Sequence, residues 1–570
     1  MAGSFEAVKP KKRGKSVLLD GPRLQKVRSR NKPSKQRDFS RLFLVQELQL
    51  GGGPSPPPSR RTSDAVDVSR KSGDNQRGVP GKPPLQHTES TASIASTTSN
   101  AASAQSHAAS TTSSGCAPSS AGLKRRATWA MKFSVDGRYL AVAGQDAVIR
   151  VYKVLDTPEA RKQEVTDLVA RAEAQLNGNL FPASGGTEGA SSTSLPGKAG
   201  NGNASAPSSV RSKGAVETPL PSVPVFASEP VREFVGHTND CLDLSWSKNG
   251  FLLSASMDKT ARLWHLSSPT CLVSFVHGDF VTSACFHPRD DRFFLSGSLD
   301  GKLRLWNIPA KRVQCSQEVP GLITACAFTR TGGTACVGTF AGAALFYSTD
   351  GLVYQSSIAV RSPTGKNAKG GRKITGIEPL IDDSAAGERV LITSNDSRIR
   401  AYNLRDKALS GRFKASKTYT NRTSQIRASV SEDGMYVIAG SEAGSEGGFV
   451  HLWDVGQLAG DANGTPSSIK ASGDSCCEYF SAASGTITCA VMAPLKTHSY
   501  LRTSEDPILL HAEMRNAGRV SSHTTSALSS MSLASPQPGF DARSCRILAS
   551  VDESAVVRIW RQDSYGALPA

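Results

Sequence analysis

An aromatic residue closes a short apolar segment at seven places along the chain, and this recurrence constrains the fold more than any other feature. The closing residues are Tyr152, Trp264, Trp306, Tyr347, Tyr402, Trp453 and Trp560. Trp264, Trp306 and Tyr347 follow one another at intervals of 42 and 41 residues. A fixed period means that each unit is one supersecondary element that buries its apolar face against its neighbours. The 570 residues are therefore expected to form one repeat fold.

A period of about 40 to 45 residues is typical of the blades of WD-repeat β-propellers. Seven units predict an all-β, seven-bladed WD40-type β-propeller. Two residue types recur at fixed distances from the closing aromatic, an aspartate six residues before it and an arginine two before it: Asp146, Asp258, Asp300 and Asp396, and Arg150, Arg262, Arg304, Arg400 and Arg558. In the seventh unit the aspartate, Asp552, stands two residues earlier than this position.

Two units contain a set of four polar and aromatic residues that is typical of WD repeats. The sets are His237, Ser254, Asp258 and Trp264 in the second unit, and His277, Ser296, Asp300 and Trp306 in the third. Such a tetrad ties the loop before a blade to the inner strands, because buried polar groups need hydrogen-bond partners. A histidine engaged in this way is not available as a general base. We expect structural tetrads and no catalytic residue.

The ring of blades has to close, because open sheet edges invite aggregation. The last unit ends at Trp560 and supplies only three strands, so the run of apolar residues at 40–49 is expected to be the closing strand. The expected division of the chain is a basic disordered arm at 1–39, a closing segment at 40–50, a disordered insertion at 51–122, first-blade strands at 123–155, an insertion with a short helix at 156–228, the other blades at 229–560 with an insertion at 496–542, and a tail at 561–570.

The second insertion begins with a helical pattern. Its apolar residues follow the spacing of one helix face: Val165, Leu168, Val169, Ala172 and Leu176. Amphipathic stripes usually serve a core. We expect this helix to pack on its own propeller rather than on a partner.

The formal charge is +18, and the first fifty residues, with 13 Lys and Arg against 4 Asp and Glu, supply half of it. The cluster from Lys9 to Lys15 resembles a nuclear-import signal, although such charge runs are most often solvated tails. The eleven cysteines show no CxxC spacing, so neither a metal nor a cofactor is expected. No apolar run of about 20 residues is present, which favours a soluble intracellular protein.

Basic residues are expected to gather on one face of the disc, where the loops between blades and the tight turns within blades meet. The candidates are Lys124, Arg125, Arg126, Arg361, Lys366, Lys369, Arg372, Lys373, Lys417 and Arg422, with Lys259, Lys302 and Arg398 in the turns. The opposite face is expected to receive Asp290, Asp291, Asp382, Asp383, Glu432 and Asp433. The basic face would suit anionic lipid headgroups or an acidic protein surface, or be merely solvated.

Kinase-type sites are expected at Thr62, Ser63 and Thr128.

Several segments outside the repeat consensus resemble the WD-repeat Rab-GTPase-binding, or rabphilin-like, protein family. They are residues 236–238, 242–249, 286–309, 371–379 and 394–400. The resemblance covers 40–50 and 123–560. It implies a non-enzymatic, peripheral membrane effector of a Rab-type small GTPase in vesicle and endosomal traffic, cytoplasmic and on endosomal or Golgi membranes.

Other functions remain open at this stage. A nuclear scaffold fits the pI of about 9.5, and a ubiquitin-ligase-associated scaffold is another role of propellers. Nucleic acid is an unlikely partner on the sequence, because no strand carries an aromatic-basic RNA motif. The Gly365–Gly371 segment lacks the ending of a phosphate-binding loop, so it does not indicate an enzyme. We expect a monomeric propeller with protein partners.

Overall fold

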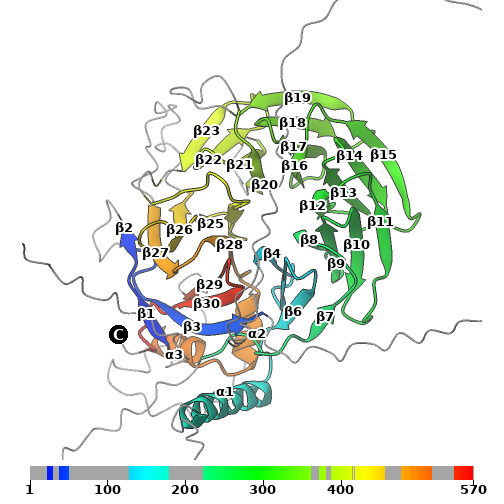
Figure 1. Cartoon of the computed structure of the whole chain (residues 1–570). Coiled ribbons are helices and arrows are strands. Elements are labelled where there is room, and N and C mark those ends of the chain that lie inside the picture. The colour runs from blue at the N-terminus through cyan, green and yellow to red at the C-terminus, as the bar shows by residue number, and fades with distance from the viewer. Residues whose placement is uncertain are drawn as a thin grey trace, which may run out of the picture. The chain divides into compact units, whose positions relative to one another are not determined.

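The computed structural model describes residues 22–29, 37–50, 127–178, 223–360, 371–380, 387–413, 415, 418–455, 477–516 and 545–568. The disordered insertion expected at 51–122 lies outside them. The described strands form seven antiparallel sheets arranged as the blades of a ring (Figure 1). The expected seven-bladed β-propeller is confirmed.

Blades 1 to 4 each consist of four strands, numbered from the centre of the ring outward. They are β4 Thr128–Phe133, β5 Tyr139–Gly144, β6 Ile149–Lys153 and β7 Arg232–Phe234; β8 Cys241–Trp246, β9 Phe251–Ser256, β10 Thr260–His265 and β11 Val273–Val276; β12 Val281–Phe286, β13 Phe293–Ser298, β14 Lys302–Asn307 and β15 Arg312–Glu318; and β16 Ile323–Phe328, β17 Thr334–Thr339, β18 Ala343–Ser348 and β19 Tyr354–Ala359.

Blade 5 also has four strands, whereas blades 6 and 7 have five. Blade 5 comprises β20 Ile374–Leu380, β21 Arg389–Ser394, β22 Arg398–Asn403 and β23 Leu409–Phe413; blade 6 comprises β24 Ser429–Val430, β25 Tyr436–Gly440, β26 Gly448–Asp454, β27 Cys477–Ala483 and β2 Arg28–Ser29; and blade 7 comprises β28 Ile487–Met492, β29 Ile547–Asp552, β30 Val556–Gln562, β3 Leu42–Gln49 and β1 Arg23–Gln25.

The second strand of each blade is buried on both faces, because each blade is sandwiched between two others. β9, for example, is buried from Leu252 to Ser256, and the closing aromatic Trp264 of β10 is fully buried. Small residues allow the blades to approach closely. A Cβ atom at Gly297 would lie 2.4 Å from the Ile323 side chain of the next blade. The repeated pattern of apolar and small residues thus determines the ring.

The N-terminal segment completes the ring. β3 pairs antiparallel with β30, with Leu44 opposite Trp560. β1 then pairs with β3, and β2 pairs with β27 of blade 6. Residues 22–29 therefore belong to the propeller, and the disordered arm expected at 1–39 is wrong there. Without β1, the outer edge of β3 would leave backbone N–H and C=O groups unpaired. β1 forms hydrogen bonds with these groups.

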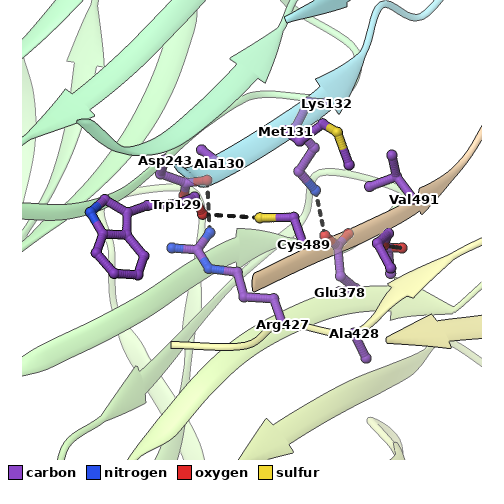
Figure 2. Close-up of a pocket in the computed structure, with 12 residues that line it drawn as sticks. Trp129, Ala130, Met131, Lys132, Asp243, Glu378, Arg427, Ala428, Cys489 and Val491 are labelled. Carbon is purple, nitrogen blue, oxygen red and sulfur yellow. Dashed lines mark hydrogen bonds and ion pairs between the residues drawn. The ribbon is translucent and has the colours of Figure 1, made fainter. Parts of the chain in front are cut away.

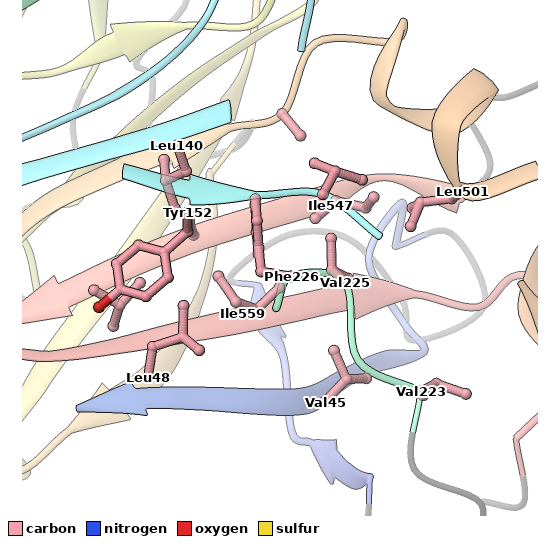
Figure 3. Close-up of a cluster of buried hydrophobic side chains, with 14 of the residues drawn as sticks. Val45, Leu48, Leu140, Tyr152, Val223, Val225, Phe226, Leu501, Ile547 and Ile559 are labelled. Atoms are coloured by element: carbon pink, nitrogen blue, oxygen red, sulfur yellow. The ribbon is translucent and has the colours of Figure 1, made fainter. Parts of the chain in front are cut away.

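A large apolar cluster lies at the seam between blades 7 and 1 (Figure 3). It joins residues that are far apart in the sequence: Val45 and Leu48 of β3, Leu140, Tyr152, Val223, Val225, Phe226, Leu501, Ile547 and Ile559. Val154 also forms a β-bridge with Phe226. Residues 223–226 are thus part of the core, so the expected insertion at 156–228 ends too late. The sequence analysis missed this segment because its few apolar residues lie between polar stretches.

Three helices cover the seam: α1 Pro158–Gly178, α2 Thr497–Thr503 and α3 Pro507–Asn516. The last two fall in the insertion expected at 496–542, whose first part is therefore ordered. Leu501, Ile508 and Leu509 are buried, which anchors these helices to the apolar cluster. As expected, α1 packs on its own propeller, but its most buried side chains are the polar Arg161 and Glu164. Of the apolar stripe, Val165 and Leu168 are half-buried and Val169 is exposed.

Buried charges fasten the seam. Asp506, between α2 and α3, accepts hydrogen bonds from the backbone N–H groups of Ile508 and Leu509. Its other carboxylate oxygen lies 2.6 Å from Arg561 of β30 and 3.1 Å from Arg161 of α1. One carboxylate therefore ties both insertions to the last strand.

The expected tail at 561–570 is also part of the fold up to residue 568. The buried Asp563 carboxylate accepts hydrogen bonds from the N–H groups of Gly566, Ala567 and Leu568. The Leu568 side chain is buried in the seam cluster. Among the described helices, none is long and apolar enough to cross a bilayer.

Candidate functional site

The predicted tetrad of blade 2 is present with all its hydrogen bonds. His237 lies 2.7 Å from both Asp258, through Nδ1, and Ser254, through Nε2. The Trp264 indole N–H donates to Ser254 Oγ at 2.9 Å. Although burial acts to raise the pKa of Asp258, hydrogen bonds from His237 and Thr260 hold it well below its ordinary value. Both ring nitrogens of His237 are engaged, as expected for a structural residue.

The predicted tetrad of blade 3 is only partly formed. His277 contacts Ser296 at 2.8 Å, and Trp306 donates to Ser296 at 2.9 Å. The other ring nitrogen of His277 faces the Phe275 carbonyl, not Asp300 as expected. Asp300 instead pairs with Arg304 at 2.7 Å.

The physical reason for this difference lies in one residue. In blade 2, the Thr260 hydroxyl bonds both Asp258 and Arg262, and Arg262 stays 3.9 Å from the carboxylate. Blade 3 has Lys302 at that position. Without a hydroxyl group in between, the blade 3 arginine reaches the aspartate directly.

The aspartates and arginines at fixed offsets form ion pairs in other blades as well. Asp146 pairs with Arg150, and Asp396 with Arg400. In blade 7, the displaced Asp552 still pairs with Arg558, at 2.8 Å. These pairs fasten each tight turn to its own blade, so their charges are used within the fold.

Two ion pairs cross the central channel (Figure 2). Lys132 of blade 1 lies 2.6 Å from Glu378 of blade 5, and Asp243 of blade 2 lies 2.7 Å from Arg427, which precedes blade 6. Burial opposes the charged form of Lys132, but the carboxylates of Glu378 and Asp243 raise its pKa above the ordinary value. Each pair joins blades that are not neighbours in the ring.

The channel retains a cavity of about 30 Å³ beside these pairs, which is room for roughly two water molecules. Its walls also include Trp129 and Cys489, whose thiol hydrogen-bonds the Trp129 carbonyl at 3.2 Å. Burial raises the pKa of Cys489 to about 11, so the thiol is protonated and unreactive at neutral pH. The ion pairs and the small cavity assign this part of the channel a structural role.

On one face of the propeller, each blade has a backbone hydrogen bond between a turn residue and a loop residue, and these pairs form a ring around the channel. This face, which we call the turn face, is formed by the loops that connect consecutive blades and by the tight turn between the second and third strand of each blade. In each blade the residue after the second strand donates its N–H to a carbonyl of the preceding loop. Examples are Met257 to Asp240, Leu299 to Phe280, Phe340 to Leu322 and Asn395 to Lys373.

Among the described residues, large apolar side chains stand at these positions in blades 2, 3 and 4, whereas blade 1 has Ala127 and Gln145. We call Met257, Phe280, Leu299, Leu322 and Phe340 the apolar arc. Phe340 is 57% exposed and Leu322 46% exposed, and the other three are half-buried. A contiguous exposed apolar patch is typical of interaction sites. The sequence analysis missed these residues, although Met257, Leu299 and Phe340 each stand seven residues before a closing aromatic.

Most of the predicted basic face lies outside the described residues. This applies to Lys124, Arg125, Arg126, Arg361, Lys366, Lys369 and Lys417. Arg372 and Arg422 are described and exposed, and Lys373 is half-buried. Burial lowers the pKa of Lys373. Lys259 and Lys302 of the predicted face lie in blades 2 and 3, where they pair with Asp279 at 3.8 Å and Glu318 at 3.5 Å. The other described residues form a smaller basic sector, Arg372, Lys373, Arg398 and Arg422, beside blade 5.

The acidic residues expected on the opposite face are largely engaged in the fold. Asp290 pairs with Arg292, and Asp433 with the buried Arg546, both at 2.7 Å. Asp291 accepts a hydrogen bond from Asn249, and Glu432 from the N–H of Leu495. Asp382 and Asp383 lie outside the described residues. The acidic side chains thus serve turns and loop contacts.

The predicted phosphorylation sites divide in the same way. Thr62 and Ser63 lie outside the described residues. Thr128 is buried in β4, opposite Gly144. A kinase could not reach its hydroxyl in the folded propeller, so the expectation for Thr128 is wrong.

Comparisons with known proteins agree with this geometry. The model of the "WD domain, G-beta repeat" family matches residues 125–153, 228–265 and 269–307. The chain is 43% identical to WD repeat-containing protein 44 of Xenopus laevis over 57% of this chain and 33% of that protein. It is 32% identical to an uncharacterized WD repeat-containing protein of Schizosaccharomyces pombe over 70% of this chain and 59% of the relative.

A further relative is the 2-deoxy-glucose resistant protein 2 of Saccharomyces cerevisiae, 33% identical over 51% of this chain and 35% of its own length. The chain thus spans between a third and three fifths of these relatives. The matched repeats, the tetrads and the seven sheets together establish what the chain is. It contains WD repeats and folds as a seven-bladed WD-type β-propeller, a fold that typically serves as a non-enzymatic scaffold for other proteins.

Proposed function

We propose that this chain is a non-enzymatic scaffold that binds protein partners through its turn face and acts with a Rab-type small GTPase in vesicle traffic. The observation that carries the scaffold proposal is the apolar arc. Large apolar side chains remain accessible at equivalent positions of three consecutive blades, and in blades 2 and 3 they lie near histidines that are already hydrogen-bonded. Such patches on soluble proteins generally mark partner-binding surfaces.

The GTPase is the finer part of the proposal. It rests on the resemblance of residues such as 286–309 and 371–379 to the rabphilin-like family, and it implies a peripheral location on endosomal or Golgi membranes. The test is affinity capture by a panel of Rab-type GTPases, each fixed in its GTP-bound or GDP-bound form. We expect binding to a GTP-bound member. Equal binding to both nucleotide states, or to none of the panel, would contradict the effector role.

The basic sector supports a second candidate, contact with an anionic membrane. Arg372, Lys373 and Arg422 lie on the turn face, and each basic side chain near an anionic surface contributes up to about 1 kcal/mol. The variant with Lys366, Lys369, Arg372 and Lys373 all changed to Glu should sediment less with phosphatidylserine vesicles, most clearly at low salt. Unchanged sedimentation of a folded variant would exclude this contact. Imaging of a tagged copy of the protein adds a separate check. Localisation to cytoplasmic puncta would support a role in vesicle traffic, and localisation to the nucleoplasm would support the nuclear scaffold.

A further inference from the structure

The apolar arc and the basic sector form one continuous surface. Phe340 and Leu322 are joined by a backbone hydrogen bond of 2.9 Å. The adjoining turn residue Gly342 packs against the next loop so closely that a Cβ atom there would lie 2.7 Å from the Arg372 amide nitrogen. Lys373 occupies the equivalent loop position of blade 5 on the turn face, where its carbonyl accepts a hydrogen bond from the Asn395 N–H. Apolar side chains therefore give way to basic ones between blades 4 and 5.

The rest of the ring has the opposite character. In blades 6 and 7 the equivalent positions are Glu442 and Glu553, and Glu446 lies in the same blade 6 turn. Three N–H groups of residues 422–424 already hold the Glu442 carboxylate. The turn face is thus divided into an apolar part, a basic part and an acidic part.

We propose that the apolar arc and the basic sector together bind a linear segment of a partner protein in which apolar side chains stand beside acidic ones. The apolar side chains would cover Leu322 and Phe340, and the acidic ones would face Arg372 and Lys373. This inference rests on the proposed scaffold function, but it does not depend on which GTPase is bound.

Charge complementarity favours such a segment over a membrane. An anionic bilayer would meet Glu442 and Glu553 on the same face and be repelled by them, whereas Glu446 is paired with Arg28 at 3.1 Å. A narrow segment that follows the rim from blade 2 to blade 5 avoids these carboxylates. Opposite charges at the end of an apolar contact also fix the direction in which the segment lies, which is the usual contribution of interface electrostatics.

The test uses peptide display on the full chain. Random 16-residue peptides are selected, and the enriched ones are measured as labelled peptides by fluorescence anisotropy. We expect enriched sequences in which apolar and acidic residues are adjacent. Phe340→Ser, and separately the pair Arg372→Glu and Lys373→Glu, should weaken binding at least tenfold. In the pair variant, exchanging the acidic residues of the peptide for lysine should restore binding.

A matched control is available in the same blade. Val353 is 62% exposed, but it lies between β18 and β19, at the opposite end of blade 4 from Phe340. Val353→Ser should leave the affinity unchanged. Four results would overturn the proposal: no enrichment, enriched peptides without acidic residues, binding that depends on Val353 and not on Phe340, and loss of vesicle binding in Phe340→Ser with peptide binding intact. GTPase capture is measured separately, so its failure leaves the peptide result interpretable.

Discussion

Blades 2 to 4 and the seam between blades 7 and 1 solve the problem of stability in different ways. Blades 2 to 4 are each built from one continuous stretch of chain, and in blades 2 and 3 the tetrad hydrogen bonds and turn ion pairs recur with the sequence period. The seam combines segments near residues 45, 160, 225, 505 and 560. Because repeated contacts hold blades 2 to 4, their rim can leave large apolar side chains exposed. The seam buries its apolar residues and adds buried charges.

This difference predicts that closure is most sensitive to the N-terminal strands. Removing residues 1–49 deletes β1, β2 and β3 and leaves the edge of β30 unpaired. We expect aggregation or loss of a cooperative melting transition, because an exposed edge strand pairs with other chains. Light scattering and thermal melting measure this. Removal of residues 1–21 alone is the control and should preserve the transition; a soluble, cooperatively melting 50–570 chain would contradict strand closure.

The second prediction concerns the buried charges of the seam. Asp506→Ala leaves Arg161 and Arg561 without their shared carboxylate, and removing one partner of a buried ion pair typically costs about 3 to 5 kcal/mol. Urea denaturation should show a loss of this size. Asp291→Ala, at a surface turn, should cost about 0.5 kcal/mol or less. Equal effects of the two substitutions would mean that the seam charges do not fasten the ring.

The third prediction uses pH. Burial lowers the pKa of His451 to about 3, whereas an unfolded histidine titrates near 6.5. The unfolded chain therefore binds more protons below pH 6.5, so the free energy of unfolding decreases as the pH falls from 6.5 toward 3. His451 alone should account for about 2 kcal/mol between pH 7.5 and pH 5.

His451→Phe tests this assignment, because it keeps an aromatic ring in contact with Trp453, Tyr419 and Tyr479. The variant should show a weaker pH dependence of urea stability by close to one proton. His277, whose pKa burial and Arg304 lower to about 4, should supply part of the remaining dependence. An unaltered pH slope in the His451 variant would show that another group is responsible.

The smallest effect is expected at the rim. Phe340→Ser should change the free energy of unfolding by less than about 0.5 kcal/mol, since exposed side chains contribute little to packing. In blade 2, Trp264→Phe removes the hydrogen bond to Ser254 and should cost about 1 to 2 kcal/mol. Thermal melts of both variants make the comparison. If Phe340→Ser lowered the free energy of unfolding more than Trp264→Phe does, the apolar arc would be part of the core and not a binding surface.

The repeat could be predicted from the sequence because each blade uses the same residues at the same offsets. The seven closing aromatic residues were enough to predict the number of blades. The predicted closing strand also pairs with the last strand, with Leu44 opposite Trp560. Asp300 was harder, because its partner depends on whether residue 302 carries a hydroxyl group. Local composition could not reveal β1, which is a strand only because the edge of β3 needs hydrogen bonds.

The seam and the binding surface were less accessible to sequence reasoning. Arg161, Asp506 and Arg561 come from remote segments, so no local pattern connects them. The apolar stripe of α1 did not reveal that the most buried side chains of this helix are Arg161 and Glu164, which find partners on other segments. The basic residues led the sequence analysis to the turn face. The apolar arc could be recognised only after the hydrogen-bonded turn and loop positions of the seven blades were compared in the structure.

The pairing of β3 with β30 also has a consequence for the order of events during synthesis. Residues 42–49 leave the ribosome more than 500 residues before their partner at Val556–Gln562. At about 5 to 20 residues per second, this strand waits on the order of half a minute or longer. Throughout that interval this apolar strand lacks its partner. Its yield in cells should therefore depend on chaperones that shield this segment until translation ends.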